Sequence, residues 1–252
     1  MGKEARNKAR ELRAAQVAAE QRRRKRMRLF GWIGGLVIVG LLAGIIYVVA
    51  DAMSDDDGGR PTGELVVPAN ADANGAVVVG QANAPVTVDV YQDFICPGCG
   101  AFEQANGSEL ERLVNEGKIK LALHPLGFLD EYSQGTRYSS RAANAFATVA
   151  DRAPGSLLAF NKALYVEQPA ENTKGLNDDK IAEIAVKAGV PQDVADAFKD
   201  RIFEPWVADS TEKAFKAGIK GTPTVKINGK NYEGDFTAPG ALTQAIAAAG
   251  GK

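Results

Sequence analysis

The sequence predicts an α/β fold, preceded by one N-terminal transmembrane helix. Three observations predict it. Residues 29–50 form an uncharged apolar run. A strand-like stretch at 86–91 leads into a Cys-Pro-Gly-Cys motif that opens a helix. A hairpin signal near the C-terminus follows a long helical stretch, so the chain contains both strands and helices, as an α/β fold requires.

The first 50 residues combine a basic tail with an apolar run. Residues 1–28 hold 11 Lys/Arg and 3 Asp/Glu, a net charge of +8, whereas the rest of the chain has a net charge of −9. The run 29–50 has 22 residues, which is enough for a helix that crosses a bilayer core. Trp32 and Tyr47 lie near its two ends, where aromatic rings prefer the membrane interface. Basic residues before the run and aspartates after it predict a cytoplasmic N-terminus and an extracytoplasmic remainder.

A cleaved signal peptide is the alternative interpretation of this segment. Ala50-Asp51-Ala52 resembles a cleavage site, but the apolar run is longer than the usual core of about 7–15 residues. We therefore expect an uncleaved anchor, and we expect the tail to contact anionic lipid rather than nucleic acid. A linker at 51–72, rich in Asp, Gly and Pro, then leads to a folded domain at 73–250.

The folded domain is predicted to run strand, strand, helix, strand, helical block, hairpin, helix. The helix that starts at Cys96 is expected to break at Asn106-Gly107 and to restart at Ser108, which begins a capping-box pattern. Asn228-Gly229 suits a two-residue type I′ hairpin turn. The other elements are expected at 75–79, 86–91, 119–123, 133–217 with breaks at 154–155, 168–177 and 191, 224–227, 230–233 and 238–249.

Cys96 and Cys99 are the only cysteines of the chain, and they form one motif. Thiol–disulfide exchange needs a thiolate with a lowered pKa and a second thiol nearby. At a helix start, Cys96 meets the positive end of the helix dipole, and Cys99 lies about one turn further on. We predict that Cys96 is the nucleophile and Cys99 the resolving thiol, with Pro97 and Gly98 as active-site neighbours.

A structural disulfide and half of a zinc site are the other interpretations of this motif. Zinc usually takes four protein ligands in structural sites, and His124 is the only further Cys or His in the chain. A Cys-x-x-Cys that follows a strand and opens a helix is typical of redox function. We therefore predict no metal and no cofactor, and we expect His124 to be a structural residue at a strand end.

Pro223 stands directly before a predicted strand, where proline cannot donate to the ladder of hydrogen bonds. A cis Thr222–Pro223 bond would account for it, because such a bond sets a tight turn and leaves backbone groups free. An ordinary trans proline in a loop is the alternative. We predict a cis bond that faces the Cys96 sulfur, and a backbone at Thr222 that binds extended substrate.

With both motifs placed, the chain resembles the DsbA-like branch of the thioredoxin superfamily. The matching parts are 93–99 (Asp-Phe-Ile-Cys-Pro-Gly-Cys), the helical block and 221–229, within roughly 73–250. The resemblance implies a thioredoxin-like fold with a helical insertion and a cis-proline loop that contacts substrate. Two features depart from the family. Pro-Gly replaces the Pro-His of strongly oxidising members, and Val90 stands where many relatives keep a buried acid, with Asp89 one place off.

The resemblance also implies an activity and partners. The expected enzyme donates the Cys96–Cys99 disulfide to exported cysteine-containing proteins. A quinone-linked membrane protein of the DsbB or vitamin K epoxide reductase type is expected to reoxidise it. One alternative is a membrane-tethered disulfide reductase or isomerase. Another is a non-catalytic peptide-binding module. The presence of both cysteines together with Pro97 argues against this second alternative. The expected location is a single-pass anchor in the cell membrane, with the catalytic domain outside the cytoplasm.

Overall fold

The computed structural model describes residues 63–250 of the chain. The predicted basic tail (1–28), the anchor (29–50) and most of the linker lie outside the described residues. Within 63–250, none of the helices combines the length and the apolar character needed to cross a bilayer.

A five-stranded mixed sheet forms the centre of the described part, with strand order β1-β3-β2-β4-β5. Its strands are β1 (Val77–Val79), β2 (Val86–Gln92), β3 (Ile119–Pro125), β4 (Thr224–Ile227) and β5 (Lys230–Asn231). β2 and β3 are parallel, and the other neighbours are antiparallel. Val86, Val88 and Val90 alternate along β2 and are all buried, as expected for strand residues that share one face of a sheet.

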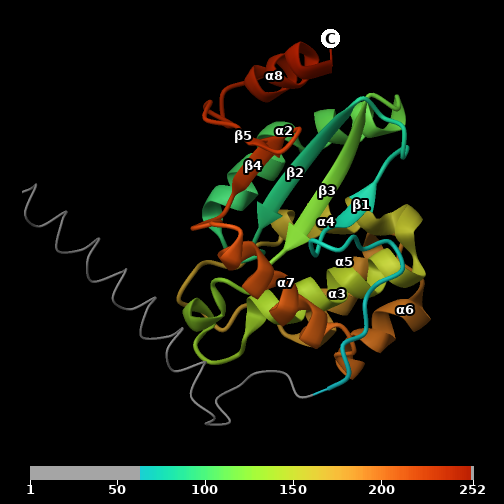
Figure 1. Cartoon of the computed structure of the whole chain (residues 1–252). Coiled ribbons are helices and arrows are strands. Elements are labelled where there is room, and N and C mark those ends of the chain that lie inside the picture. The colour runs from blue at the N-terminus through green and yellow to red at the C-terminus, as the bar shows by residue number, and fades with distance from the viewer. Residues whose placement is uncertain (1–62, 251–252) are drawn as a thin grey trace, which may run out of the picture. The chain divides into compact units, whose positions relative to one another are not determined.

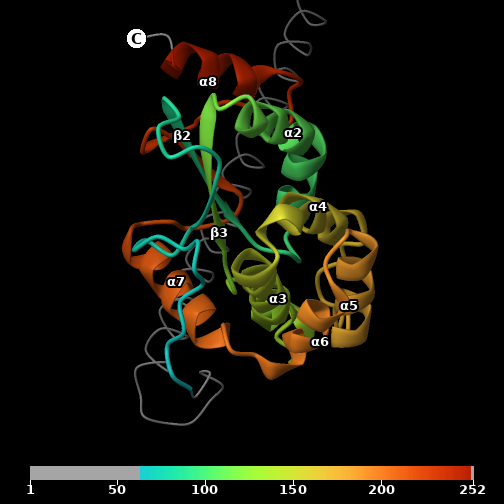
Figure 2. The same ribbon diagram turned by 90° about the vertical axis from the view of Figure 1, so that its right-hand side faces the viewer.

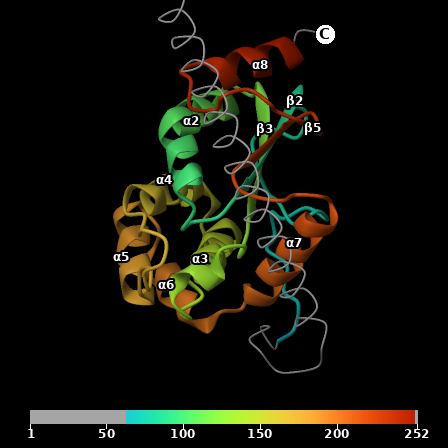
Figure 3. The same ribbon diagram turned by 90° about the vertical axis from the view of Figure 1, so that its left-hand side faces the viewer.

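Helices pack on both sides of this sheet and beyond its end. The α-helices are α2 (Pro97–Asn115), α3 (Tyr138–Arg152), α4 (Leu157–Val166), α5 (Asp178–Lys187), α6 (Gln192–Asp196), α7 (Glu204–Lys216) and α8 (Ala241–Gly250). Short 3₁₀ turns are η1 (Asp130–Ser133), η2 (Pro154–Ser156) and η3 (Ala197–Asp200). α2 and α7 lie on opposite sides of the sheet (Figures 2 and 3).

The predicted helical insertion is present between β3 and β4. Helices α3 to α6 lie beyond the carboxyl ends of the parallel pair β2 and β3 (Figure 1). α3 is the centre of this group, because all of its residues except the last two are buried. The insertion therefore covers the edge of the sheet at which β2 ends and the cysteine motif begins.

The predicted break at Asn106-Gly107 is wrong, because α2 runs without interruption through both residues. Asn106 is buried, and its Nδ2 donates hydrogen bonds to the Phe102 carbonyl at 3.0 Å and to the Phe236 carbonyl at 2.7 Å. The second acceptor lies in the segment before α8. This tertiary contact satisfies the amide inside the helix, so the local tendency of Asn-Gly to end a helix does not prevail.

Other boundaries differ by a few residues. Residues 134–137 are not helical, and Gln134 and Arg137 take left-handed backbone angles. A break at 201–203 adds to the three predicted ones, β5 is shorter than predicted, and α8 begins at Ala241. The type I′ turn is confirmed, because Asn228 and Gly229 both have positive φ, at 49° and 77°.

Ordered contacts begin slightly before the predicted start of the domain. Ala71 forms an isolated bridge with Val77 of β1. The N–H of Ala69 donates a hydrogen bond of 2.9 Å to the Asp151 carboxylate. The last residues of the predicted linker thus pack against the sheet edge and the end of α3.

Candidate active site

Cys96 and Cys99 lie where β2 passes into α2. Cys96 is the N-cap residue of α2, and Pro97 is the first helical residue, where its missing N–H leaves no hydrogen bond unmade. Both cysteines are free thiols in this structure, 7% and 1% exposed respectively. Pro97 is exposed between them. The motif therefore presents its first sulfur near the surface and keeps its second sulfur in the core.

The two thiols have opposite pKa shifts. A hydrogen bond from the Cys99 thiol is the largest cause that lowers the pKa of Cys96, which falls to about 6 despite partial burial. Smaller contributions come from the Thr222 side chain and from backbone N–H groups at the start of α2. Burial raises the pKa of Cys99 well above its usual value, and the neighbouring Cys96 raises it further. At neutral pH the reduced pair therefore holds a thiolate at Cys96 and a thiol at Cys99.

The proline loop lies against this pair, as predicted. The Thr222–Pro223 bond is cis. Cys96 Sγ lies 3.2 Å from the Thr222 carbonyl oxygen, to which it donates a hydrogen bond when it is protonated. A Cβ at Gly98 would lie 3.0 Å from Pro223 Cδ, so the glycine between the cysteines admits the proline ring. The structure thus brings together all six residues that the sequence predicted for the site: Cys96, Pro97, Gly98, Cys99, Thr222 and Pro223.

Asp93 is a buried acid that the sequence did not predict. Its carboxylate is fully buried and accepts hydrogen bonds from the backbone N–H groups of Ile95 and Leu129 and from Ser139 Oγ, at 3.0, 2.9 and 2.7 Å. Its own N–H points to Cys99 Sγ at 3.5 Å. Burial raises the pKa of Asp93 to about 7, although the hydrogen bonds oppose the shift. Its position three residues before Cys96 was the available signal.

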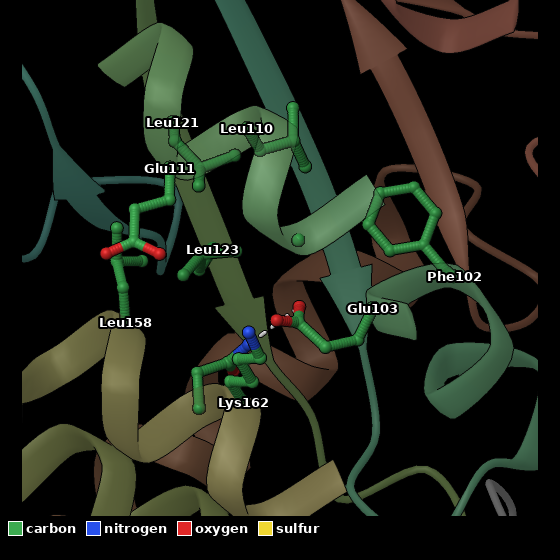
Figure 4. Close-up of a pocket in the computed structure, with 10 residues that line it drawn as sticks. Phe102, Glu103, Leu110, Glu111, Leu121, Leu123, Leu158 and Lys162 are labelled. Carbon is green, nitrogen blue, oxygen red and sulfur yellow. Dashed lines mark hydrogen bonds between the residues drawn. The ribbon is translucent and has the colours of Figure 1, made fainter. Parts of the chain in front are cut away.

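A second acid, the half-buried Glu103, lies one helical turn beyond Cys99. Burial raises the pKa of Glu103 to about 7. Asn161 Nδ2 donates to its carboxylate at 3.0 Å, and Asn161 Oδ1 accepts from Gln92 Nε2 at 2.7 Å. Figure 4 shows Glu103 on α2 pointing toward α4, where Lys162 lies beside a small pocket. The pocket has a volume of about 20 Å³, close to what one water molecule requires.

The remaining polar residues of interest lie away from the sulfurs. His124 is buried, stacks on Tyr91 with ring centroids 3.9 Å apart, and lies 3.3 Å from the Asp89 carboxylate. Asp89 therefore contacts the strand-end histidine and not the cysteine pair. Within 63–250, no group of three His, Cys, Asp or Glu side chains is arranged to hold a metal ion.

Comparisons with known proteins agree with this geometry. A thioredoxin family model matches residues 72–247, more than half of the chain. The solved structure of the reduced disulfide bond oxidoreductase DsbG from Mycobacterium tuberculosis is 31% identical, with a TM-score of 0.62 over 72% of this chain and 90% of that chain. Reduced DsbA from the same organism is 30% identical, with a TM-score of 0.61 over 71% of this chain and 93% of that chain.

A curated relative matches over a shorter range. The serine/threonine-protein kinase PknE of Mycobacterium tuberculosis is 35% identical over 120 residues, or 46% of this chain. The match spans only about a fifth (21%) of the length of that kinase.

The chain belongs to the thioredoxin family, as a disulfide oxidoreductase of the DsbA type with a mixed sheet and helical insertion.

Proposed function

We propose that this protein donates the Cys96–Cys99 disulfide to exported proteins outside the cytoplasm. The observation that carries the proposal is the placement of Cys96 at the start of α2 and of Cys99 in the core, which lowers the pKa of the first thiol to about 6 and raises that of the second. A stabilised Cys96 thiolate favours the reduced form of the pair. A pair that favours its reduced form gives up its disulfide readily.

The reaction then proceeds in two exchanges. A substrate thiolate attacks Cys96 Sγ of the disulfide, a mixed disulfide forms, and Cys99 leaves and takes up a proton. The substrate's second thiolate next attacks the substrate sulfur of the mixed disulfide and releases Cys96 as a thiolate. The substrate loses two electrons, which the cysteine pair gains. The low pKa makes Cys96 a good leaving group in the second exchange.

The surroundings of Cys96 support a peptide as substrate. The Thr222 carbonyl lies next to the sulfur, on a loop that leads into β4. An extended substrate can pair with backbone groups of such a loop, as in strand addition. The reduced pair must then be reoxidised, and a quinone-linked membrane protein of the DsbB or vitamin K epoxide reductase type is the partner we propose. The anchor at 29–50 would keep the two proteins in the same membrane.

The direction of electron flow is tested by equilibrating the protein with defined ratios of reduced to oxidised glutathione. A disulfide donor should be half-reduced at a weakly reducing ratio, near the potential of the oxidising family members at roughly −120 to −180 mV. A potential near −270 mV, in the range of thioredoxin, would instead favour the reductase alternative. Absence of exchange with glutathione would favour the non-catalytic peptide-binding module.

A further inference from the structure

Gln168 contacts the active-site loop from the inserted helices. It lies two residues beyond the end of α4, in the connection to α5. Its Nε2 donates hydrogen bonds to the Phe94 carbonyl at 3.1 Å and to the Cys96 carbonyl at 2.9 Å. These acceptors lie 74 and 72 residues earlier in the chain. One side chain of the insertion therefore binds the backbone on both sides of Ile95.

The Cys96 carbonyl is a critical acceptor in the site. It already accepts the first hydrogen bonds of α2, from the N–H groups of Cys99 at 3.0 Å and Gly100 at 3.2 Å. The same turn of backbone aims the N–H groups of Gly98 and Cys99 at the Cys96 sulfur and lowers its pKa. A donor that fixes this carbonyl therefore fixes the orientation of the groups that stabilise the thiolate, although Gln168 does not touch the sulfur.

Gly100 provides the space for Gln168. A Cβ at residue 100 would lie 2.3 Å from Gln168 Oε1 and 3.2 Å from its Cδ. Gly100 lies inside α2 and does not have a positive φ, so its backbone does not require glycine. Glycine in a helix interior costs about 0.5–1 kcal/mol relative to alanine. The glycine is explained by the close approach of the glutamine amide.

We propose that Gln168 is a positioning residue for Cys96, through which the inserted helices set the reactivity of the nucleophilic thiol. Other contacts of the insertion act on the opposite end of the same loop, because Ser139 binds the Asp93 carboxylate and Tyr165 Oη donates to the Asp93 carbonyl at 3.4 Å. Gln168, in contrast, donates its hydrogen bond to the backbone carbonyl of Cys96. The inference rests on the thiol–disulfide exchange proposed above, but it does not depend on the direction of electron flow.

The test compares Gln168→Ala, Gly100→Ala and the double variant with the wild-type full-length chain. Gly100→Ala leaves the glutamine in the chain but displaces its amide, so it perturbs the same contact from the helix side. Gly155→Ala is the matched control, because a Cβ there meets nothing within 4 Å. Two quantities are measured: the pKa of Cys96, by ultraviolet absorbance of the thiolate, and the equilibrium constant with glutathione.

We expect each single variant to raise the pKa of Cys96. We also expect each to shift the glutathione equilibrium toward the oxidised protein by about three- to tenfold, the size expected for one or two lost neutral hydrogen bonds. The double variant should change little further, because both substitutions remove one contact. The control should match the wild type.

An unchanged pKa and an unchanged equilibrium constant in both single variants would overturn the proposal, even if thermal stability fell. Additive effects in the double variant would also overturn it. If Gln168→Ala does not fold, Gly100→Ala and Gln168→Met, which has a side chain of similar length but no donor and no charge, provide the same comparison. A reducing potential of the wild-type protein would contradict the proposed donation of disulfides. The differences between variants and wild type in the pKa of Cys96 and in the glutathione equilibrium would still test the role of Gln168.

Discussion

At the scale of single residues, the site separates two chemically identical thiols by their surroundings. Cys96 lies at the helix start, where hydrogen bonds stabilise its anion, whereas Cys99 lies in the core, where an anion is costly. The residues between the two cysteines are Pro97 and Gly98. The low pKa of Cys96 thus depends on Cys99, Thr222 and backbone N–H groups, without help from an intervening side chain.

This separation predicts different behaviour for the two serine variants. Cys96→Ser should abolish exchange with a substrate, because no nucleophile or accessible sulfur remains. Cys99→Ser should accumulate mixed disulfides with substrates, because the resolving thiol is lost. Non-reducing electrophoresis of the two variants after incubation with a thiol-containing protein measures the trapped complexes. Equal trapping by both variants would show that the assigned roles are wrong.

The carboxyl groups of the buried Asp93 and the half-buried Glu103 predict a pH dependence of stability. Asp93 and Glu103 have folded-state pKa values raised to about 7, against about 4 when unfolded. Between those values the folded protein holds protons that the unfolded chain has released. The free energy of unfolding should therefore fall as pH rises from about 4 to about 7.

Asp93→Asn removes one of these titrations and keeps the shape of the side chain. Its free energy of unfolding, measured by denaturant titration of the reduced protein at several pH values, should fall less steeply than that of the wild type. The slopes should differ by up to about 1.4 kcal/mol per pH unit, the limit for one proton. The absolute stabilities will also differ, so the slopes are compared. Glu131→Gln, at an exposed position, is the control, and parallel curves for Asp93→Asn and wild type would contradict the assignment.

At the scale of helices and strands, short sequence patterns predicted the elements that are determined by interactions between residues close in the chain. The strand at 86–91, the Asn-Gly turn and the breaks in the helical block at 154–155, 168–177 and 191 all appear where the sequence indicated. The continuity of α2 could not be predicted this way. It depends on a hydrogen bond from Asn106 to Phe236, 130 residues later in the chain.

The same distinction applies to the site. Cys96, Cys99, Thr222 and Pro223 could be predicted because each belongs to a short motif with a chemical reason. The further residues depend on partners that are distant in sequence: Ser139 lies 46 residues from Asp93, Asn161 lies 58 residues from Glu103, and Cys96 lies 72 residues from Gln168. Asp93 is marked by its position three residues before Cys96, but no local pattern marks Glu103 or Gln168.

At the scale of the whole molecule, the topology determines where the insertion can act. β2 and β3 are parallel, so their carboxyl ends lie at one edge of the sheet. The cysteine motif follows β2 directly, and the insertion begins after β3. The inserted helices must therefore start beside the active site, and contacts such as Ser139 with Asp93 follow from that placement.

The orientation in the membrane is a prediction about the whole chain. Residues 1–28 carry a net charge of +8, the run 29–50 is uncharged, and aspartates at 51 and 55–57 follow it. Basic residues are retained on the cytoplasmic side of a membrane, so the domain at 73–250 should lie outside. An enzyme that makes disulfides requires that side, because cytoplasmic thiol pools keep cysteines reduced.

A reporter that is active only outside the cytoplasm, fused after Lys252, should therefore be active in cells. Removing the basic cluster tests the cause: neutral residues in place of Arg22, Arg23, Arg24, Lys25, Arg26 and Arg28 should reduce the exported fraction, because the orientation signal is weakened. Neutral substitutions of Arg6 and Arg10, further from the apolar run, should have a smaller effect. An inactive reporter on a stably expressed wild-type fusion would place Cys96 in the cytoplasm. Donation of disulfides to exported proteins would then be excluded, and the reductase alternative would have to explain the low pKa of Cys96.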